Sequence, residues 1–470
     1  GNYNTALGYQ AGKLLTSGTQ NVLIGAFAGD SLTTGNSNTA VGYLALQKES
    51  AHGSNVAIGR QALTVLEAGA NSNNVAIGNS AGIALTTGIQ NNLIGALAGD
   101  ALTTGSANVV MGHQALSNET TGSKNVAIGQ FAMTESTLSS RNVAVGTRAL
   151  KQLASTSLTN TYNVGIGYDA GVQMTTGTQN TILGGFAGDA LTSALSNTAI
   201  GYGTLSAATT SSRNVAVGHS ALGSGVMNTG TSTYNTAVGF GAGGVVSTGV
   251  QNTLIGGIAG DALTTGGRNV AVGYAALTTE DEYGRNIAIG RSALQTLNAA
   301  QDGYNVAVGD DAGVSMSTGI KNTVIGGTAG RTLTTGANNT LLGYSSGYAI
   351  TSGSDNNIIG GLAGDALTTG ASNVMIGKSA GSAATTSSDN VFIGHIAGQN
   401  SNLTRANIGI GYGALRAATP GSLAYTHNIG IGFNAGTSIT TGVENTIVGG
   451  QAADVLTIGN YNTVLGYAAL

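Results

Sequence analysis

The chain repeats one short frame from end to end. An asparagine is followed at its third position by Ile, Val, Leu or Met, at its fourth always by Gly, and at its seventh in most copies by Ala. The frame occurs 27 times, and 21 of the 26 intervals between its asparagines are 17 residues long. A fixed short period held over a whole chain is the signature of a solenoid, whose units bury a core only by stacking on their neighbours.

The 17-residue unit predicts strands and turns. It is too short for a strand and a helix, and it shows no apolar stripe of helical period. Gly is 78 of 470 residues without a three-residue period and with a single Pro, which excludes collagen. A hydrophobic content of 41% with net charge -4 argues against disorder. We therefore predict an all-β parallel β-solenoid of 27 coils, one continuous segment over residues 1–470, with a second short strand through segments such as Leu102–Gly105.

Side-chain alternation divides the frame into two faces. In the string NVAIG, Val56 and Ile58 share one face of a strand, and Ala57 and Gly59 share the other. We expect the larger side chains to fill the inside of each coil. The Ala and Gly columns then form an outer strip without bulk, which another sheet can approach closely. Such a strip left in water is an extended apolar patch, so it favours a homotrimer over a monomeric solenoid.

The repeated asparagines predict a ladder. We expect the amide of each coil to stack on that of the next, because in-register amides satisfy one another's hydrogen bonds along a stack. The role is structural, since a chemical task for 27 identical amides has no physical rationale. Rungs taken from along the chain are Asn4, Asn38, Asn55, Asn125, Asn142, Asn214 and Asn462.

Five intervals are longer than 17 residues, two by two residues and three by four. They place swollen loops near residues 64–73, 151–162, 223–234, 295–304 and 416–427. Loops carry recognition more often than scaffold columns do, and Tyr is a favoured contact residue. The candidate recognition residues are Tyr162, Tyr234, Tyr304 and Tyr425, with the only proline, Pro420, in the last loop. The alternative is that each Tyr only packs over the wider coil beside its insertion.

Other chemistry-bearing residues predict no catalytic, metal or cofactor site, and we expect no enzyme. The chain has no Cys, and its His residues (52, 113, 219, 395 and 427) lack ligand spacing and are expected to face solvent. The densest acidic cluster, Glu280–Glu282, is expected to be a solvated loop. A recurring Asp favours a turn or capping carboxylate over a cation ligand. Its copies are Asp30, Asp100, Asp189, Asp261, Asp365 and Asp454.

The strings NVAIGRQAL at Asn55, NVAIGQFAM at Asn125 and NVAVGTRAL at Asn142 resemble a known family. They are similar to the SVAIGxxA head repeats of trimeric autotransporter adhesins, the YadA-like heads, and to repeats of phage tail fibres. The resemblance implies a left-handed parallel β-roll, three chains packed around one axis, and a role in attachment. The repeat here is longer than that head repeat, mostly through the LTTG region, and no stalk, neck or membrane anchor is present in the segment.

These observations together predict a structural fibre or adhesin segment. We expect a rigid, surface-exposed, extracellular rod on a bacterial cell or a phage virion tail, taken from a longer chain. Its partners are expected to be its own copies and an unidentified receptor, a cell-surface glycan or protein. The pI near 5.7 excludes a basic footprint for nucleic acid, and no apolar run is long enough to enter a membrane. The alternatives are a self-assembling extracellular filament and an ice- or surface-binding solenoid that uses Thr pairs such as Thr33 and Thr34.

Overall fold

The computed structural model describes residues 3–227, 230–419 and 424–470. It divides into two compact units, Gly1–Tyr234 and Asn235–Leu470. Both units consist of short strands joined by turns, and the described residues contain no helix. None of them therefore forms a helix that could span a membrane. The predicted all-β parallel β-solenoid, with about 27 coils and a repeat near 17 residues, is confirmed.

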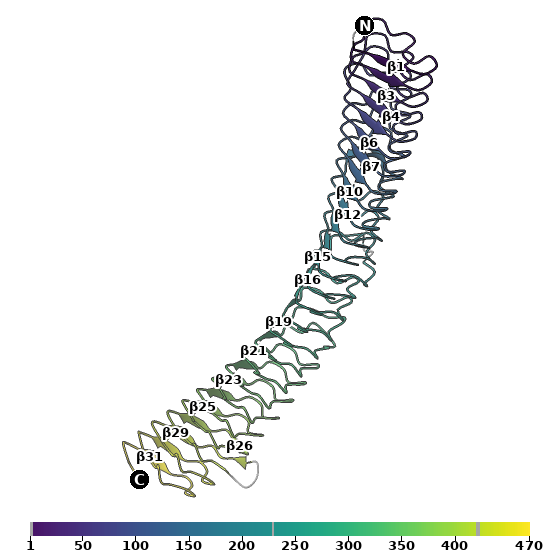
Figure 1. The fold of residues 1–470 in the computed structure, drawn as a ribbon. Coiled ribbons are helices and arrows are strands. Elements are labelled where there is room, and N and C mark those ends of the chain that lie inside the picture. The colour runs from purple at the N-terminus through teal and green to yellow at the C-terminus, as the bar shows by residue number, and fades with distance from the viewer. Residues whose placement is uncertain (1–2, 228–229, 420–423) are drawn as a thin grey trace. The chain divides into compact units, whose positions relative to one another are not determined.

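In the first unit, one three-residue strand follows each frame asparagine, and the strands lie one above another (Figure 1). These frame strands are β1 (Thr5–Leu7), β2 (Val22–Ile24), β3 (Thr39–Val41), β4 (Val56–Ile58), β5 (Val75–Ile77), β6 (Asn92–Ile94), β7 (Val109–Met111), β8 (Val126–Ile128), β10 (Val143–Val145), β12 (Val164–Ile166), β13 (Thr181–Leu183), β14 (Thr198–Ile200) and β15 (Val215–Val217).

The second unit repeats the arrangement. Its frame strands are β16 (Thr236–Val238), β17 (Thr253–Ile255), β18 (Val270–Val272), β19 (Ile287–Ile289), β20 (Val306–Val308), β21 (Thr323–Ile325), β22 (Thr340–Leu342), β23 (Asn357–Ile359), β24 (Val374–Ile376), β25 (Val391–Ile393), β27 (Ile408–Ile410), β29 (Ile429–Ile431), β30 (Thr446–Val448) and β31 (Thr463–Leu465). Within each unit the described pairings keep the frame in register, as in Val22↔Thr39 of β2 and β3 and Val270↔Ile287 of β18 and β19.

Two insertions lie beside extra strand pairs. In the first unit β11 (Ala154–Asn160) pairs in parallel with β9 (Thr137–Ser140), and its register shifts between Ala154 and Thr159. The four-residue insertion is therefore accommodated in part by a bulge. In the second unit β28 (Ala424–Tyr425) pairs with β26 (Thr404–Arg405). Pro420 and the rest of 420–423 lie outside the described residues.

The inside and the outside of the coil are the reverse of our prediction. In β4, Ala57 is fully buried, whereas Val56 and Ile58 on either side of it are only half-buried. The same alternation, a buried middle residue between two more exposed ones, recurs in the frame strands between β2 and β30. Strand alternation was predicted correctly, but the small residue faces inward and the β-branched pair faces outward.

The interior accepts a small residue because other columns fill it. We number frame positions from the asparagine as position 0. In the coil of Asn55, Ala57 at position 2 is accompanied by Leu63 at position 8, and both are fully buried. In the coil of Asn91 the sizes are exchanged, with Leu93 at position 2 and Gly99 at position 8. Close packing of a narrow interior requires this exchange of volume.

The glycine at position 4 is invariant because a side chain there would collide with the next coil of the same chain. Gly59 has a φ of +132°, and a Cβ added there would lie 2.3 Å from the carbonyl oxygen of Gly78, the equivalent glycine of the next coil. The neighbouring coil thus makes the close contact, and no second chain is needed to explain the column. The Ala column at position 7 is inside the coil, as shown by Ala62 and Ala81, which are fully buried. Our prediction that the Ala columns form an outer strip was wrong, and the half-buried Gly column is explained by its contact with the next coil.

The second strand predicted through the LTTG segments is absent from Leu102–Gly105, where the chain bends at Thr103 and Thr104. Leu102 is fully buried, and neighbouring coils still exchange backbone hydrogen bonds there, as from Thr103 N to the oxygen of Thr120 at 2.8 Å. The Thr103 hydroxyl donates to the same oxygen at 3.0 Å. Thr33 makes the equivalent bond to Ser50 at 2.9 Å. The first Thr of these pairs therefore directs its hydroxyl hydrogen at the backbone of its own chain, whereas the second, as at Thr34 and Thr104, is exposed.

Candidate functional site

Within each unit the frame asparagines form a series of hydrogen bonds that joins successive coils. The side-chain oxygen of Asn74 accepts from the backbone N–H of Asn91 at 2.9 Å and from its side-chain amide at 3.3 Å. The Asn91 amide also donates to the carbonyl of Gly105 at 2.9 Å, and Asn91 is fully buried. Both groups of the side chain are thus occupied in holding one coil to the next. The same main-chain bond joins Asn55 to Asn38, Asn142 to Asn125, Asn214 to Asn197 and Asn462 to Asn445.

Each of the four candidate tyrosines is exposed and held by an arginine of the preceding coil. The ring centroids lie 5.2 to 5.5 Å from the guanidinium carbons. In each pair a guanidinium nitrogen also donates to the phenolic oxygen. We call these pairs Arg–Tyr clasps, and they are Arg141–Tyr162, Arg213–Tyr234, Arg285–Tyr304 and Arg405–Tyr425.

The arginines of the clasps were missed by the sequence analysis, although a signal for three of them was present. Arg141 stands directly before one frame asparagine and Tyr162 directly before the next. Arg213 with Tyr234 and Arg285 with Tyr304 follow the same rule. Because coils stack in register, equivalent positions one coil apart become neighbours. The stacking energy of an exposed guanidinium on a ring is about 0.5–1 kcal/mol, so each clasp stabilises its swollen loop modestly.

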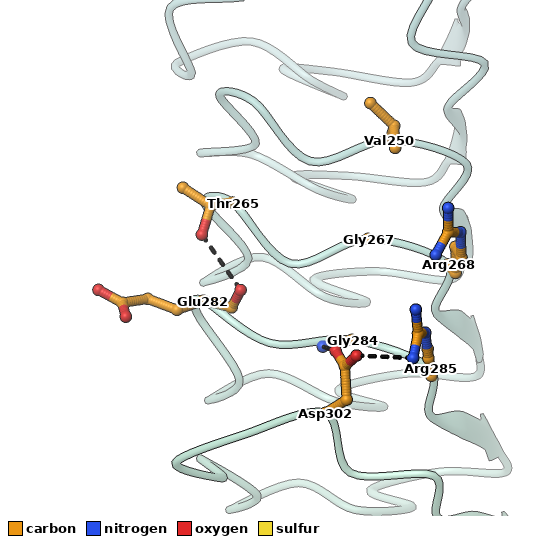
Figure 2. A pocket seen from close by; sticks show the side chains of 8 residues that line it. All are labelled: Val250, Thr265, Gly267, Arg268, Glu282, Gly284, Arg285 and Asp302. Atoms are coloured by element: carbon orange, nitrogen blue, oxygen red, sulfur yellow. Dashed lines mark hydrogen bonds and ion pairs between the residues drawn. The ribbon is translucent and has the colours of Figure 1, made fainter.

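A shallow polar groove lies beside the third clasp (Figure 2). Its volume is about 230 Å³, and Val250, Thr265, Gly267, Arg268, Glu282, Gly284, Arg285 and Asp302 line it. Arg285 forms an ion pair with Asp302 at 2.9 Å, and Arg268 donates through Nε to the side chain of Gln251 at 3.1 Å. The groove thus presents two guanidinium groups from consecutive coils.

Three glutamates lie fully inside the coils at position 11, where most coils carry an apolar residue: Glu49, Glu119 and Glu280. For Glu280 this overturns our expectation of a solvated loop. Burial raises the pKa of Glu280 to about 7, against hydrogen bonds from the backbone N–H groups of Ala299 and Tyr283 that lower it. Glu119 is far better satisfied, since its two oxygens accept from five backbone N–H groups and one hydroxyl.

Two of the buried glutamates explain the two-residue insertions. The coil after Glu49 and the coil after Glu280 are the two with 19-residue intervals. Glu49 accepts from the N–H of Ala68 at 3.2 Å, and Glu280 accepts from the N–H of Ala299 at 3.3 Å. Ala68 and Ala299 both lie in the inserted loops and are buried. The carboxylate thus satisfies a buried N–H group that the inserted residues would otherwise leave without a partner.

The recurring aspartates at position 9 behave as turn carboxylates. Partial burial raises the pKa of Asp100, Asp189, Asp261 and Asp365, while hydrogen bonds from neighbouring backbone N–H groups lower it. In the described part of the chain no three His, Cys, Asp or Glu residues are grouped to hold a metal ion.

Four of the five histidines, His113, His219, His395 and His427, are exposed, as we expected, and His52 is half-buried. His113, His219, His395 and His427 each lie beside an aromatic ring, with centroids 5.3 to 5.7 Å apart. His52 lies 3.4 Å from the carboxylate of Glu49. These contacts give the histidines a packing role.

The outer face of the frame sheet carries an aliphatic column at position 3. All 27 coils have Ile, Val, Leu or Met there, although the position faces outward. In the first unit Met111 is 45% exposed and Leu183 42%; in the second unit Ile255 is 38% and Leu342 42% exposed. An outward position that never admits a polar residue is unusual for a surface in contact with water.

Comparison of the chain with protein-family models and with curated proteins finds no match.

Proposed function

We propose that the chain is a segment of a structural attachment fibre, a rigid extracellular rod on a bacterial cell surface or a phage tail. The Asn bonds and the in-register strands repeat from coil to coil, and this regularity supports a role as a stiff spacer. The swollen loops carry exposed tyrosines on the outside of the coils, where a receptor can reach them. The resemblance to adhesin head repeats and phage fibre repeats agrees with this role.

The proposed assembly is three copies packed side by side, each a left-handed β-roll. The aliphatic column is the observation that carries this proposal, in place of the Ala columns, which lie inside the coils, and the Gly column, which contacts the next coil of the same chain. Its residues project from a regular sheet at equivalent frame positions, so the same column of another copy can pack against it. Burial of apolar area contributes about 25 cal/mol per Å², and the column supplies such area in every coil.

Light scattering of the purified chain tests the assembly. We expect a particle of three chains of 46.0 kDa each. A variant with Ile255→Lys, Ile289→Lys and Leu342→Lys places charges in the aliphatic column and should give the single-chain mass while keeping its β-sheet circular dichroism. The matched control is Thr104→Lys, Thr335→Lys and Thr369→Lys, three exposed positions in the LTTG turns. It should remain trimeric. A single-chain mass for the unaltered protein contradicts the proposed assembly.

A further inference from the structure

We propose that the groove beside Arg268 and Arg285 binds an acidic saccharide, with the carboxylate of a uronic or sialic acid held by Arg268. This inference rests on the proposed attachment function and names the chemical class of its receptor. Four features of the second unit carry it: an unpaired guanidinium, a bare floor, acceptors for hydroxyl groups and an exposed ring.

The charge of Arg268 is not neutralised within the chain. Its Nε donates to Gln251, and among the described residues it forms no ion pair. Arg285, one coil further on, is paired with Asp302 at 2.9 Å. The nearby carboxylate of Glu282 points away from both guanidinium groups in Figure 2, while its backbone oxygen accepts from the Thr265 hydroxyl at 3.1 Å. A planar guanidinium with free terminal nitrogens matches a carboxylate, which can accept two parallel hydrogen bonds.

The floor of the groove carries no side chain. A Cβ added to Gly284 would lie 1.8 Å from the oxygen of Gly267, so coil stacking excludes any other residue there. At Gly267 an added Cβ would lie 2.9 Å from the oxygen of Val250. The result is an open strip of backbone between Arg268 on one side and Thr265 on the other (Figure 2). A pyranose ring can lie on such a strip.

Asp302, which lines the groove, and Tyr304, which does not line it but pairs with Arg285, favour a sugar over a simple anion. The Asp302 carboxylate is paired with Arg285 and accepts from the N–H of Gly284 at 3.2 Å, and its remaining lone pairs can accept from sugar hydroxyl groups, which a simple anion lacks. Directly after it in the chain, beyond Gly303, Tyr304 is 49% exposed and its ring is held by the clasp with Arg285. A fixed aromatic ring gives the C–H face of a pyranose an apolar surface at little cost in side-chain entropy.

A matched position exists for the test. Arg213 occupies the same frame column as Arg268 and Arg285. Like Arg285 it forms a clasp, with Tyr234, but the equivalent residue one coil before it is Ser196, where Arg285 has Arg268. Gln is native to this column at Gln251, so Arg268→Gln and Arg213→Gln are both compatible with the local backbone. Each removes one positive charge.

The experiment is titration of the full chain, by calorimetry and by saturation-transfer NMR, with methyl glucuronide and sialyllactose as charged probes. Methyl glucoside and lactose are the uncharged probes, and inorganic sulfate is the simple anion. We expect the charged sugars to bind at least about tenfold more tightly than the uncharged sugars and than sulfate. Arg268→Gln should weaken the binding of the charged sugars by about tenfold or more, because a hydrogen bond to a charged group is lost. Arg213→Gln should leave their binding unchanged.

Three results would overturn the inference: no binding of either charged sugar, equal loss in the two arginine variants, or sulfate binding as tightly as the sugars. Light scattering of the same samples separates this inference from the proposed assembly. Trimers that do not bind the charged sugars contradict the saccharide site alone. Single chains that bind them contradict the trimer alone.

Discussion

The side chain of Leu150 occupies the space that a methyl group on Gly165 would need. A Cβ added to Gly165 would lie 2.6 Å from Cγ of Leu150, which belongs to the preceding coil. The same leucine fills the space beside Gly171, where an added Cβ would lie 2.9 Å from its Cδ2. The coil of Asn163 thus has Gly at positions 2 and 8, and Leu150 of the coil before it and Ile182 of the coil after it fill the space. The core is shared between coils, and a single coil does not contain a complete core of its own.

This sharing predicts a coupled response to mutation. Leu150→Ala should cost about 2–5 kcal/mol by leaving a cavity, and Gly165→Ala should cost roughly 1–3 kcal/mol by overpacking. The double variant should cost less than the sum, because the new methyl group enters the cavity. Urea unfolding of the four proteins gives the coupling free energy.

Gly69→Ala is the control for this cycle, since an added Cβ at Gly69 meets no atom within 4 Å. It should change the free energy of unfolding by less than about 0.5 kcal/mol. Strict additivity of Leu150→Ala and Gly165→Ala would contradict the shared core.

The Asn bonds predict a sharp difference between two adjacent residues. Asn91 is fully buried with both side-chain groups bonded, whereas Asn92 in β6 is exposed. Asn91→Ala strands the backbone N–H of Asn108 and the carbonyl of Gly105, which Asn91 now satisfies. It should destabilise the protein by roughly 2–4 kcal/mol, at about 1–3 kcal/mol for each stranded group.

Asn92→Ala should change the free energy of unfolding by less than about 0.5 kcal/mol. Thermal unfolding of both variants, with hydrogen exchange to locate the effect, makes the comparison. Equal melting temperatures for the two variants would show that the buried asparagines do not hold the coils together.

The fold class could be predicted from the sequence because a 17-residue period leaves room for little else than a stacked coil. Which face of each strand points into the coil could not be predicted from one repeat, because the alternation of Ala57 and Ile58 fits either orientation. The deciding signal lay between columns: Ala57 occurs with Leu63, and Leu93 with Gly99. Two columns vary in side-chain volume in opposite directions when both fill the same enclosed space.

The recognition candidates were found only in part, for a similar reason. Tyr304 stands out as an aromatic residue in a swollen loop, but Arg285 and Arg268 look like ordinary surface charges until the coils are stacked in register. Glu280 was misassigned because neighbouring acids suggested solvent. Its frame position 11 faces the inside of the coil, as the buried Leu102 and Leu263 show. This burial can be predicted only when it is known which residues of the repeat point inward.

The burial of Glu280 predicts a pH dependence of stability. Its pKa is raised from an ordinary value of 4.5 to about 7, so the folded chain binds this proton more tightly than the unfolded chain does. The contribution of the group to stability is therefore full below pH 4.5 and falls as the pH rises through about 7, by about 3 kcal/mol at most. Glu280→Gln, which stays neutral, should flatten this part of the stability profile, measured by urea unfolding between pH 4.5 and 8. Glu282→Gln, exposed and two residues away, should leave the slope unchanged. A slope that persists in Glu280→Gln would assign the pH dependence to another group.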